Sequence, residues 1–121
     1  MSELKILLVD DEEEVVSTLV ERLRYRNIDA EFLLNGAAAI QRMREKDFDV
    51  VLLDLKLPGI SGLETMRVLK KEHPHVPIIL ITGHGSLTSG EEMPKGAFDY
   101  LPKPVDLDVL VLKIREAVQA K

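Results

Sequence analysis

The chain has 121 residues, 45% of them hydrophobic and only 4% aromatic, which suits one domain with an aliphatic core. Its net charge of −5 argues against a nucleic-acid-binding surface, and the lack of cysteine excludes disulfides, thiolate metal sites and a cysteine nucleophile. The sequence contains neither a signal-peptide pattern nor an apolar run long enough to span a membrane. We therefore expect one cytoplasmic domain over residues 1–121, without membrane or direct nucleic-acid contacts.

Short apolar runs alternate with stretches in which apolar residues recur at helical spacing. In chain order, the predicted elements are strand 6–9, helix 15–23, strand 30–34, helix 37–45, strand 50–53, helix 63–69, strand 78–81, strand 98–101 and helix 107–118. Ser61 and Asp106 are placed to cap the third and the last of these helices, and Pro74 and Pro77 end the third. The acidic Glu31 places the second strand near an edge of the sheet.

Three of the strands have no polar alternation, which is typical of parallel strands that helices cover on both faces. Alternating strands and helices predict an α/β fold with a doubly wound, five-stranded parallel sheet. In such sheets, ligands bind outside the carboxyl ends of the strands.

Polar side chains follow the carboxyl ends of four predicted strands, so we expect them to gather at one edge of the sheet. They are Asp10, Asp11, Glu12, Asp54, Thr82 and Lys103. An acidic pair after a strand is often only a helix N-cap, and a lone threonine or lysine is unremarkable. Asp54 differs, because a charged residue that ends a buried apolar strand is rarely structural.

Together these side chains indicate phosphoryl chemistry. Carboxylates held close together repel one another, which demands a cation, and their oxygens suit Mg²⁺. A metal ion would let the site accept a phosphate, for which Lys103 and Thr82 are suitable ligands. A carboxylate in line with the phosphorus can act as a nucleophile and form an acyl phosphate.

Four tracts give the whole chain a resemblance to the receiver domain of two-component response regulators. They are ILLVDD at residues 6–11, VLLDLKLPG at 51–59, ILITG at 79–83 and GAFDYLPKP at 96–104. The resemblance implies a flavodoxin-like sheet with strand order 2-1-3-4-5. The tracts at 82–86 and 96–100 look most like receivers attached to enhancer-binding transcriptional activators.

The resemblance also implies roles for the residues at the predicted edge. Asp54 matches the phosphorylated aspartate. Asp11 matches the direct ligand of Mg²⁺ (or Mn²⁺), Asp10 a ligand that acts through water, and the backbone carbonyl of Lys56 the third protein ligand. The phosphoacceptor Asp54 would itself contact the metal.

Further positions match the residues that read the phosphorylated state. Thr82 and Lys103 match those that hold the phosphoryl oxygens, and Tyr100 matches the aromatic switch that turns inward when the threonine moves. The Lys103–Pro104 bond matches one that is usually cis in receivers. A half-buried structural tyrosine remains the alternative for Tyr100.

The resemblance implies a phosphoacceptor switch rather than an enzyme, although such a domain can catalyse its own phosphorylation and slow dephosphorylation. The expected partners are a sensor histidine kinase and an output domain or downstream protein, with a possible phosphorylation-dependent homodimer. The segment 86–95 departs from the pattern, because Gly90 and Pro94 are unfavourable inside a helix. We expect a short or irregular helix there, which would weaken or change output through that face.

Three other functions compete with this interpretation. A degenerate receiver would serve only as a protein-binding module, against which the intact set of site residues argues. A phosphatase of haloacid-dehalogenase type needs an acid two residues after its nucleophile, where this chain has Lys56. A flavin or dinucleotide binder is disfavoured, because the first strand is followed by acidic residues rather than a Gly-x-Gly-x-x-Gly loop.

Overall fold

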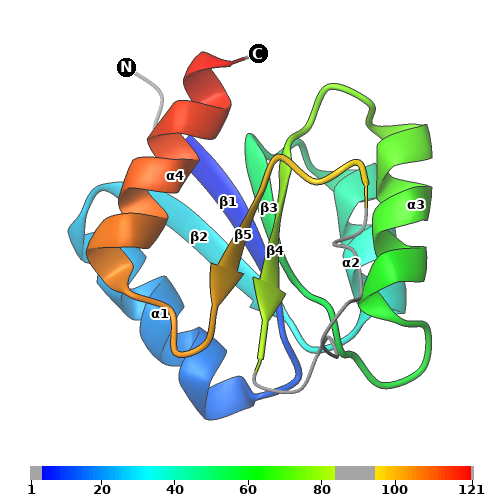
Figure 1. The fold of residues 1–121 in the computed structure, drawn as a ribbon, viewed down its shortest axis with the longest axis horizontal. Helices are drawn as coiled ribbons and strands as arrows, with labels where there is room; N and C mark the ends of the chain where they lie inside the picture. The colour runs from blue at the N-terminus through cyan, green and yellow to red at the C-terminus, as the bar shows by residue number, and fades with distance from the viewer. Residues whose placement is uncertain (1–3, 84–94, 121) are drawn as a thin grey trace.

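Strands and helices alternate along most of the chain, as the apolar pattern predicted (Figure 1). The computed structural model describes residues 4–83 and 95–120. The elements are β1 (Leu4–Val9), α1 (Glu13–Tyr25), β2 (Ile28–Leu33), α2 (Gly36–Glu45), β3 (Val50–Asp54), α3 (Gly62–Glu72), β4 (Ile78–Thr82), β5 (Asp99–Pro102) and α4 (Leu107–Gln119). The predicted irregular helix at 86–95, with Gly90 and Pro94, falls on residues 84–94, which lie outside the described part. No helix in the described part is long and apolar enough to cross a membrane.

The five strands form one parallel sheet in the order β2-β1-β3-β4-β5. The flavodoxin-like order is therefore confirmed, and so is the edge position of β2, which carries Glu31. This strand begins at Ile28, two residues earlier than predicted. One apolar and one acidic residue, Ile28 and Asp29, form too short a pattern to distinguish a strand from a turn. Both Asp54 and Thr82 are the last residues of their strands.

Helices cover both faces of the sheet, with α1 and α4 on one side and α2 and α3 on the other (Figure 1). Each central strand contributes alternate residues to two separate cores. The core under α1 and α4 includes Ile6, Leu8, Val50, Leu52, Ile79 and Ile81. The core under α2 and α3 includes Leu7, Val9, Val51, Leu53, Ile78 and Leu80. Burial on both faces explains why these strands read as uninterrupted apolar runs.

Three helix N-termini are capped by side chains. Asn35, Ser61 and Asp106 each accept a hydrogen bond from a backbone amide three residues further on, at Ala38, Glu64 and Val109. Two of these caps were predicted from the sequence. Helix α1 differs, because its N-cap Glu12 makes no capping hydrogen bond with its side chain. The Glu12 side chain is therefore available for other contacts.

Candidate functional site

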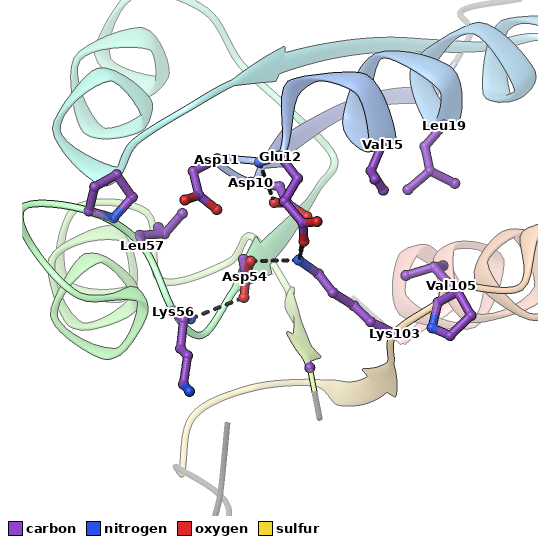
Figure 2. A pocket seen from close by; sticks show the side chains of 13 residues that line it. Asp10, Asp11, Glu12, Val15, Leu19, Asp54, Lys56, Leu57, Lys103 and Val105 are labelled. Atoms are coloured by element: carbon purple, nitrogen blue, oxygen red, sulfur yellow. Dashed lines mark hydrogen bonds and ion pairs between the residues drawn. The ribbon is translucent and has the colours of Figure 1, made fainter. Parts of the chain in front are cut away.

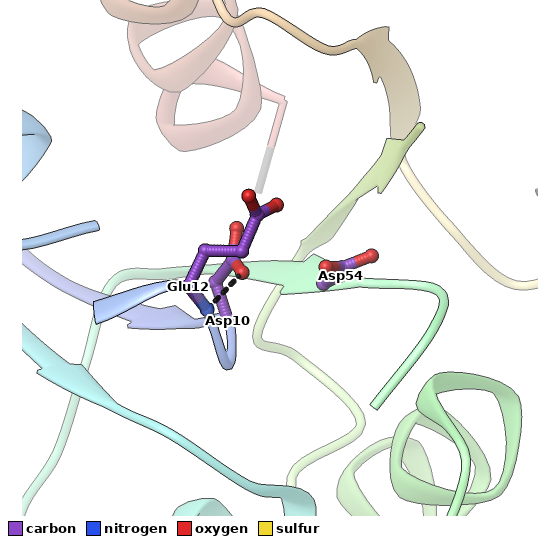
Figure 3. Close-up of side chains that lie close together, drawn as sticks. All are labelled: Asp10, Glu12 and Asp54. Atoms are coloured by element: carbon purple, nitrogen blue, oxygen red, sulfur yellow. Dashed lines mark hydrogen bonds between the residues drawn. The ribbon is translucent and has the colours of Figure 1, made fainter. Parts of the chain in front are cut away.

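The register of the sheet places two carboxylates side by side. Val9 of β1 pairs with Leu53 of β3, so the next residue of each chain segment, Asp10 and Asp54, lies at the same edge. Asp10 is only 1% exposed and Asp54 only 4%. Figure 3 shows both side chains, with that of Glu12, at the end of the sheet. The strands thus hold two nearly buried carboxylates where a parallel sheet binds its ligands.

Lys103 supplies the positive charge of this site. It follows β5, and its backbone amide donates to the Thr82 carbonyl (3.0 Å). Its ammonium nitrogen lies 2.8 Å from Asp54 Oδ2, 3.0 Å from Asp10 Oδ2 and 2.6 Å from Glu12 Oε1. Figure 2 shows the lysine reaching across to these acidic side chains. The peptide bond from Lys103 to Pro104 is cis, as the resemblance implied.

Both oxygens of Asp54 are engaged. Oδ1 accepts a hydrogen bond from the Lys56 backbone amide (3.0 Å), and Oδ2 accepts one from the Lys103 ammonium (2.8 Å). Burial nevertheless raises the pKa of Asp54 above its ordinary value, because the hydrogen bonds from Lys103 and Lys56 only partly offset the loss of solvation. The two hydrogen bonds therefore orient the Asp54 side chain, while burial leaves its ionised form less stable than in water.

For Lys103 the hydrogen bonds prevail over the effect of burial on its pKa. Burial works to lower its pKa, but hydrogen bonds to Asp54, Glu12 and Asp10 outweigh it, and the pKa of the ammonium rises. Lys103 is thus held as a cation, with its side chain 19% exposed. A fixed positive charge beside Asp54 can neutralise an anionic group that arrives there.

These residues line an open pocket of about 750 Å³ (Figure 2). Its acidic side is formed by Asp10, Asp11, Glu12 and Asp54. Apolar side chains form other parts of the wall, among them Val15, Leu19, Leu57 and Val105. The apolar wall was not predicted, because its members come from a helix and two separate loops that only the tertiary structure brings together. The pocket is large enough to hold a group of the size of a phosphate beside Asp54.

A group of carboxylates in the described residues could hold a metal ion. Asp10, Glu12 and Asp54 offer oxygens that all lie within 4.8 Å of one another. Three carboxylates against the one ammonium of Lys103 leave two formal negative charges, which a divalent cation would offset. Oxygen donors of this kind suit hard cations such as Mg²⁺.

The carboxylates that lie close together are not the same set as the predicted metal ligands, whose roles stay predictions. Asp11, predicted as the direct metal ligand, is exposed at the pocket wall and does not belong to the group of close carboxylates. Glu12 belongs to this group, although nothing in the sequence except its place beside the acidic pair pointed to such a role. Lys56, predicted to offer its carbonyl, lines the pocket and binds Asp54 through its amide.

Thr82 and Tyr100 are not among the described residues that line the pocket. The Thr82 hydroxyl donates to the Leu101 carbonyl at 3.4 Å, so it is turned toward β5. Tyr100 of β5 is partly buried and packs against the core under α2 and α3. Strand pairing of Leu80 with Tyr100 and of Thr82 with Pro102 places the two residues in neighbouring strands. Their roles as phosphoryl ligand and switch stay predictions.

Comparisons with known proteins all point to one family. The model of the response regulator receiver domain matches residues 6–115. Transcriptional regulatory protein ZraR of Klebsiella oxytoca is 37% identical over 114 residues, covering 93% of this chain and 26% of that protein. DNA-binding transcriptional regulator NtrC of Escherichia coli (strain K12) is 33% identical over 114 residues, covering 93% of this chain and 24% of that protein.

A solved structure agrees with these relatives. The crystal structure of a response regulator receiver domain protein from Clostridium thermocellum superposes with a TM-score of 0.87 at 32% identity, covering 97% of this chain and 95% of that one. The chain spans about a quarter of the two transcriptional regulators that it matches. Its fold, its acidic edge and these similarities agree: the chain belongs to the receiver domain family of the response regulators of two-component systems.

Proposed function

We propose that the domain over residues 1–121 accepts a phosphoryl group on Asp54 from a sensor histidine kinase and acts as a switch. The observation that carries this proposal is the setting of Asp54. It is 4% exposed at the end of β3, and it receives one hydrogen bond from the Lys56 amide and one from Lys103. A buried carboxylate held by two donors at the floor of an open pocket is well placed to act as a nucleophile.

The transfer balances as a simple exchange of bonds. An oxygen of Asp54 forms a bond to phosphorus, while the phosphorus–nitrogen bond to the kinase histidine breaks. The electron pair of that bond returns to the imidazole nitrogen, which can take up a proton. Lys103 neutralises negative charge beside the phosphoryl oxygens, which is the main contribution that phosphoryl transfer requires of a protein.

The proposed cofactor is Mg²⁺, or Mn²⁺ in its place. Asp11, Asp54 and the Lys56 carbonyl would hold it directly, and Asp10 would act through water, as the family resemblance implies. When bound, such an ion neutralises charge on the phosphoryl group and the carboxylates. The excess of carboxylates over ammonium groups at this edge supports its presence.

The phosphorylated state would be read out through Thr82 and Tyr100. We propose that the Thr82 hydroxyl exchanges its contact with the Leu101 carbonyl for one with a phosphoryl oxygen, and that Tyr100 then turns inward. The change would be passed to an output domain or downstream protein, or to a second copy in a phosphorylation-dependent dimer. We place this switch in the cytoplasm and assign it no catalytic turnover on an external substrate.

Metal dependence provides the direct test of phosphoryl uptake. Incubation with acetyl phosphate or phosphoramidate and Mg²⁺ should add one phosphoryl mass to the intact protein, as measured by mass spectrometry. Removal of Mg²⁺ with EDTA should lower the rate of uptake at least tenfold, on the order of one lost charge-neutralising group. Folded protein that gains no mass with Mg²⁺ present would instead favour a binding module, and repeated turnover of a small phosphoester would favour a phosphatase.

A further inference from the structure

The Lys103 ammonium has no hydrogen to spare. A lysine side chain carries three N–H donors, and three carboxylate oxygens surround this one, from Asp54 at 2.8 Å, Asp10 at 3.0 Å and Glu12 at 2.6 Å. If Lys103 is to bind a phosphoryl oxygen, as the proposed function requires, one of these contacts must be given up.

The three contacts differ in how easily they can be lost. The Asp10 side chain is 1% exposed, and its second oxygen accepts the Glu12 backbone amide at 2.9 Å, so it is fixed. The Asp54 side chain is 5% exposed and held by the Lys56 amide. The Glu12 side chain is 56% exposed, and solvent can replace its partner when it moves. An ion pair with one exposed carboxylate is weak, because water competes for the exposed charge.

We infer that Glu12 is a positioning residue that occupies one N–H donor of Lys103 in the unphosphorylated protein and is displaced by the incoming phosphoryl oxygen. This inference rests on the proposed function of Asp54. It makes Glu12 a competitor of the phosphoryl group: the contact keeps Lys103 directed at the site, and its loss is part of the cost of binding the phosphoryl oxygens. No bond other than hydrogen bonds changes in this exchange.

The fold does not need the Glu12 side chain for another purpose. Glu12 is the N-cap of α1, but its side chain makes no capping hydrogen bond. Its structural contacts come from its backbone, since its amide donates to Asp10 Oδ1 and its carbonyl accepts the Val16 amide at 3.0 Å. Substitution of the side chain therefore leaves these contacts in place, and variants at this position should fold.

Three variants separate the exchange of a contact from a simple effect of charge. Glu12→Ala removes both the acceptor and the charge. Glu12→Asp keeps the charge but shortens the side chain, which withdraws the acceptor from Lys103. Glu13→Ala is the matched control, since it removes an exposed carboxylate from the next position, at the first residue of α1.

Two measurements test the inference. The first is the NMR signal of the Lys103 ammonium without any phosphoryl group: both Glu12 variants should shift it and speed its exchange with water, and Glu13→Ala should not. The second is the Kd of beryllofluoride, a phosphoryl analogue, at Mg²⁺ concentrations that saturate each variant. Both Glu12 variants should bind it about two- to fivefold more tightly than wild type, the range that the worth of an exposed ion pair implies, with less than about twofold change for Glu13→Ala.

The outcomes distinguish this inference from the proposed function. An unchanged ammonium signal in both Glu12 variants overturns the inference. A second result would also overturn it: Glu12→Asp binds beryllofluoride with wild-type affinity, while Glu12→Ala and Glu13→Ala both bind it more tightly. In the latter case the effect is one of charge alone. Absence of beryllofluoride binding in every protein, wild type included, overturns the proposed function as well, whereas binding by wild type with unchanged affinity in the Glu12 variants overturns only the exchange.

Discussion

An Asp54→Asn variant should take up no phosphoryl group from acetyl phosphate under conditions in which wild type is fully labelled. The amide keeps the shape of the side chain, and its oxygen can still accept the hydrogen bond from the Lys56 amide. It lacks the carboxylate nucleophile, so no acyl phosphate can form. We expect the rate of mass gain to fall by at least about a thousandfold, which is on the order of the loss of a nucleophile in covalent catalysis.

The variant should lose activity without losing its fold. Burial raises the pKa of Asp54 in the folded state, so the ionised carboxylate is less favourable there than in the unfolded chain. The contribution of this group therefore favours folding below its unfolded pKa and declines as the pH rises toward its folded pKa. At neutral pH a neutral amide should leave the free energy of unfolding unchanged or increased, which urea denaturation would measure.

Asp47→Asn is the matched control for this experiment. Asp47 is exposed and precedes β3 at the end opposite to Asp54. The same change of aspartate to asparagine there should leave phosphoryl uptake at the wild-type rate. Equal uptake by the Asp54→Asn and Asp47→Asn variants would refute Asp54 as the phosphoacceptor.

Gly62→Ala should unfold or severely destabilise the domain, which is the second large effect we expect. Gly62 is the first residue of α3 and packs directly on the segment that leaves Asp54. An added Cβ would lie 2.6 Å from the Leu55 carbonyl oxygen and 2.7 Å from its Cα, and it would also overlap the Asp54 carbonyl. Because these neighbours are backbone atoms, relief requires movement of the strand end that carries Asp54.

Helix propensity alone would predict the opposite change in stability for Gly62→Ala. Alanine is the better helix former, by about 1 kcal/mol in a helix interior, so without the overlap Gly62→Ala would leave α3 at least as stable as it is. We instead expect a loss of about 3 kcal/mol or more in the free energy of unfolding, measured by urea denaturation, as for strong overpacking. If the variant still folds, phosphoryl uptake should fall with the displacement of Asp54.

Gly59→Ala, in the loop just before α3, is a useful comparison. Gly59 has a φ of +73°, but a Cβ there would meet no atom within 4 Å. Its substitution should therefore cost only about 1–2 kcal/mol, from the left-handed backbone conformation. A Gly62→Ala variant as stable as wild type, or more stable than Gly59→Ala, would contradict the packing argument.

The sequence was informative wherever burial imposed a simple pattern. Strands β3 and β4 are covered on both faces, so their apolar runs predicted them to within one residue, and Asp54 stood out as a charge at the end of such a run. The start of β1 was predicted two residues too late, because Leu4 and Lys5 are not fully buried. Strand β2 at the edge is only partly buried, and its start was misplaced by two residues. The sheet order came from the family resemblance, because periodicity alone does not determine which strands are neighbours.

The contacts within the site could not be predicted from local sequence patterns. That Lys103 lies close to Asp10, Glu12 and Asp54 depends on long-range pairing of β1, β3, β4 and β5. Nothing local distinguishes Glu12 from the acidic residues that follow it, which favour any helix N-terminus. The tight contact of Gly62 likewise arises only when α3 packs against the end of β3. Residue type and position predicted the members of the site, while tertiary structure decided their contacts.

The central claim is that Asp54 carries the phosphoryl group, and its most direct test locates that group. Borohydride reduces an acyl phosphate to an alcohol, so treatment of the phosphorylated wild type should convert one carboxyl side chain. Peptide mass spectrometry should then find the reduced side chain at position 54 and at no other aspartate. Reduction at Asp10 or Asp11, or a stable phosphoryl group on a histidine, would contradict the account.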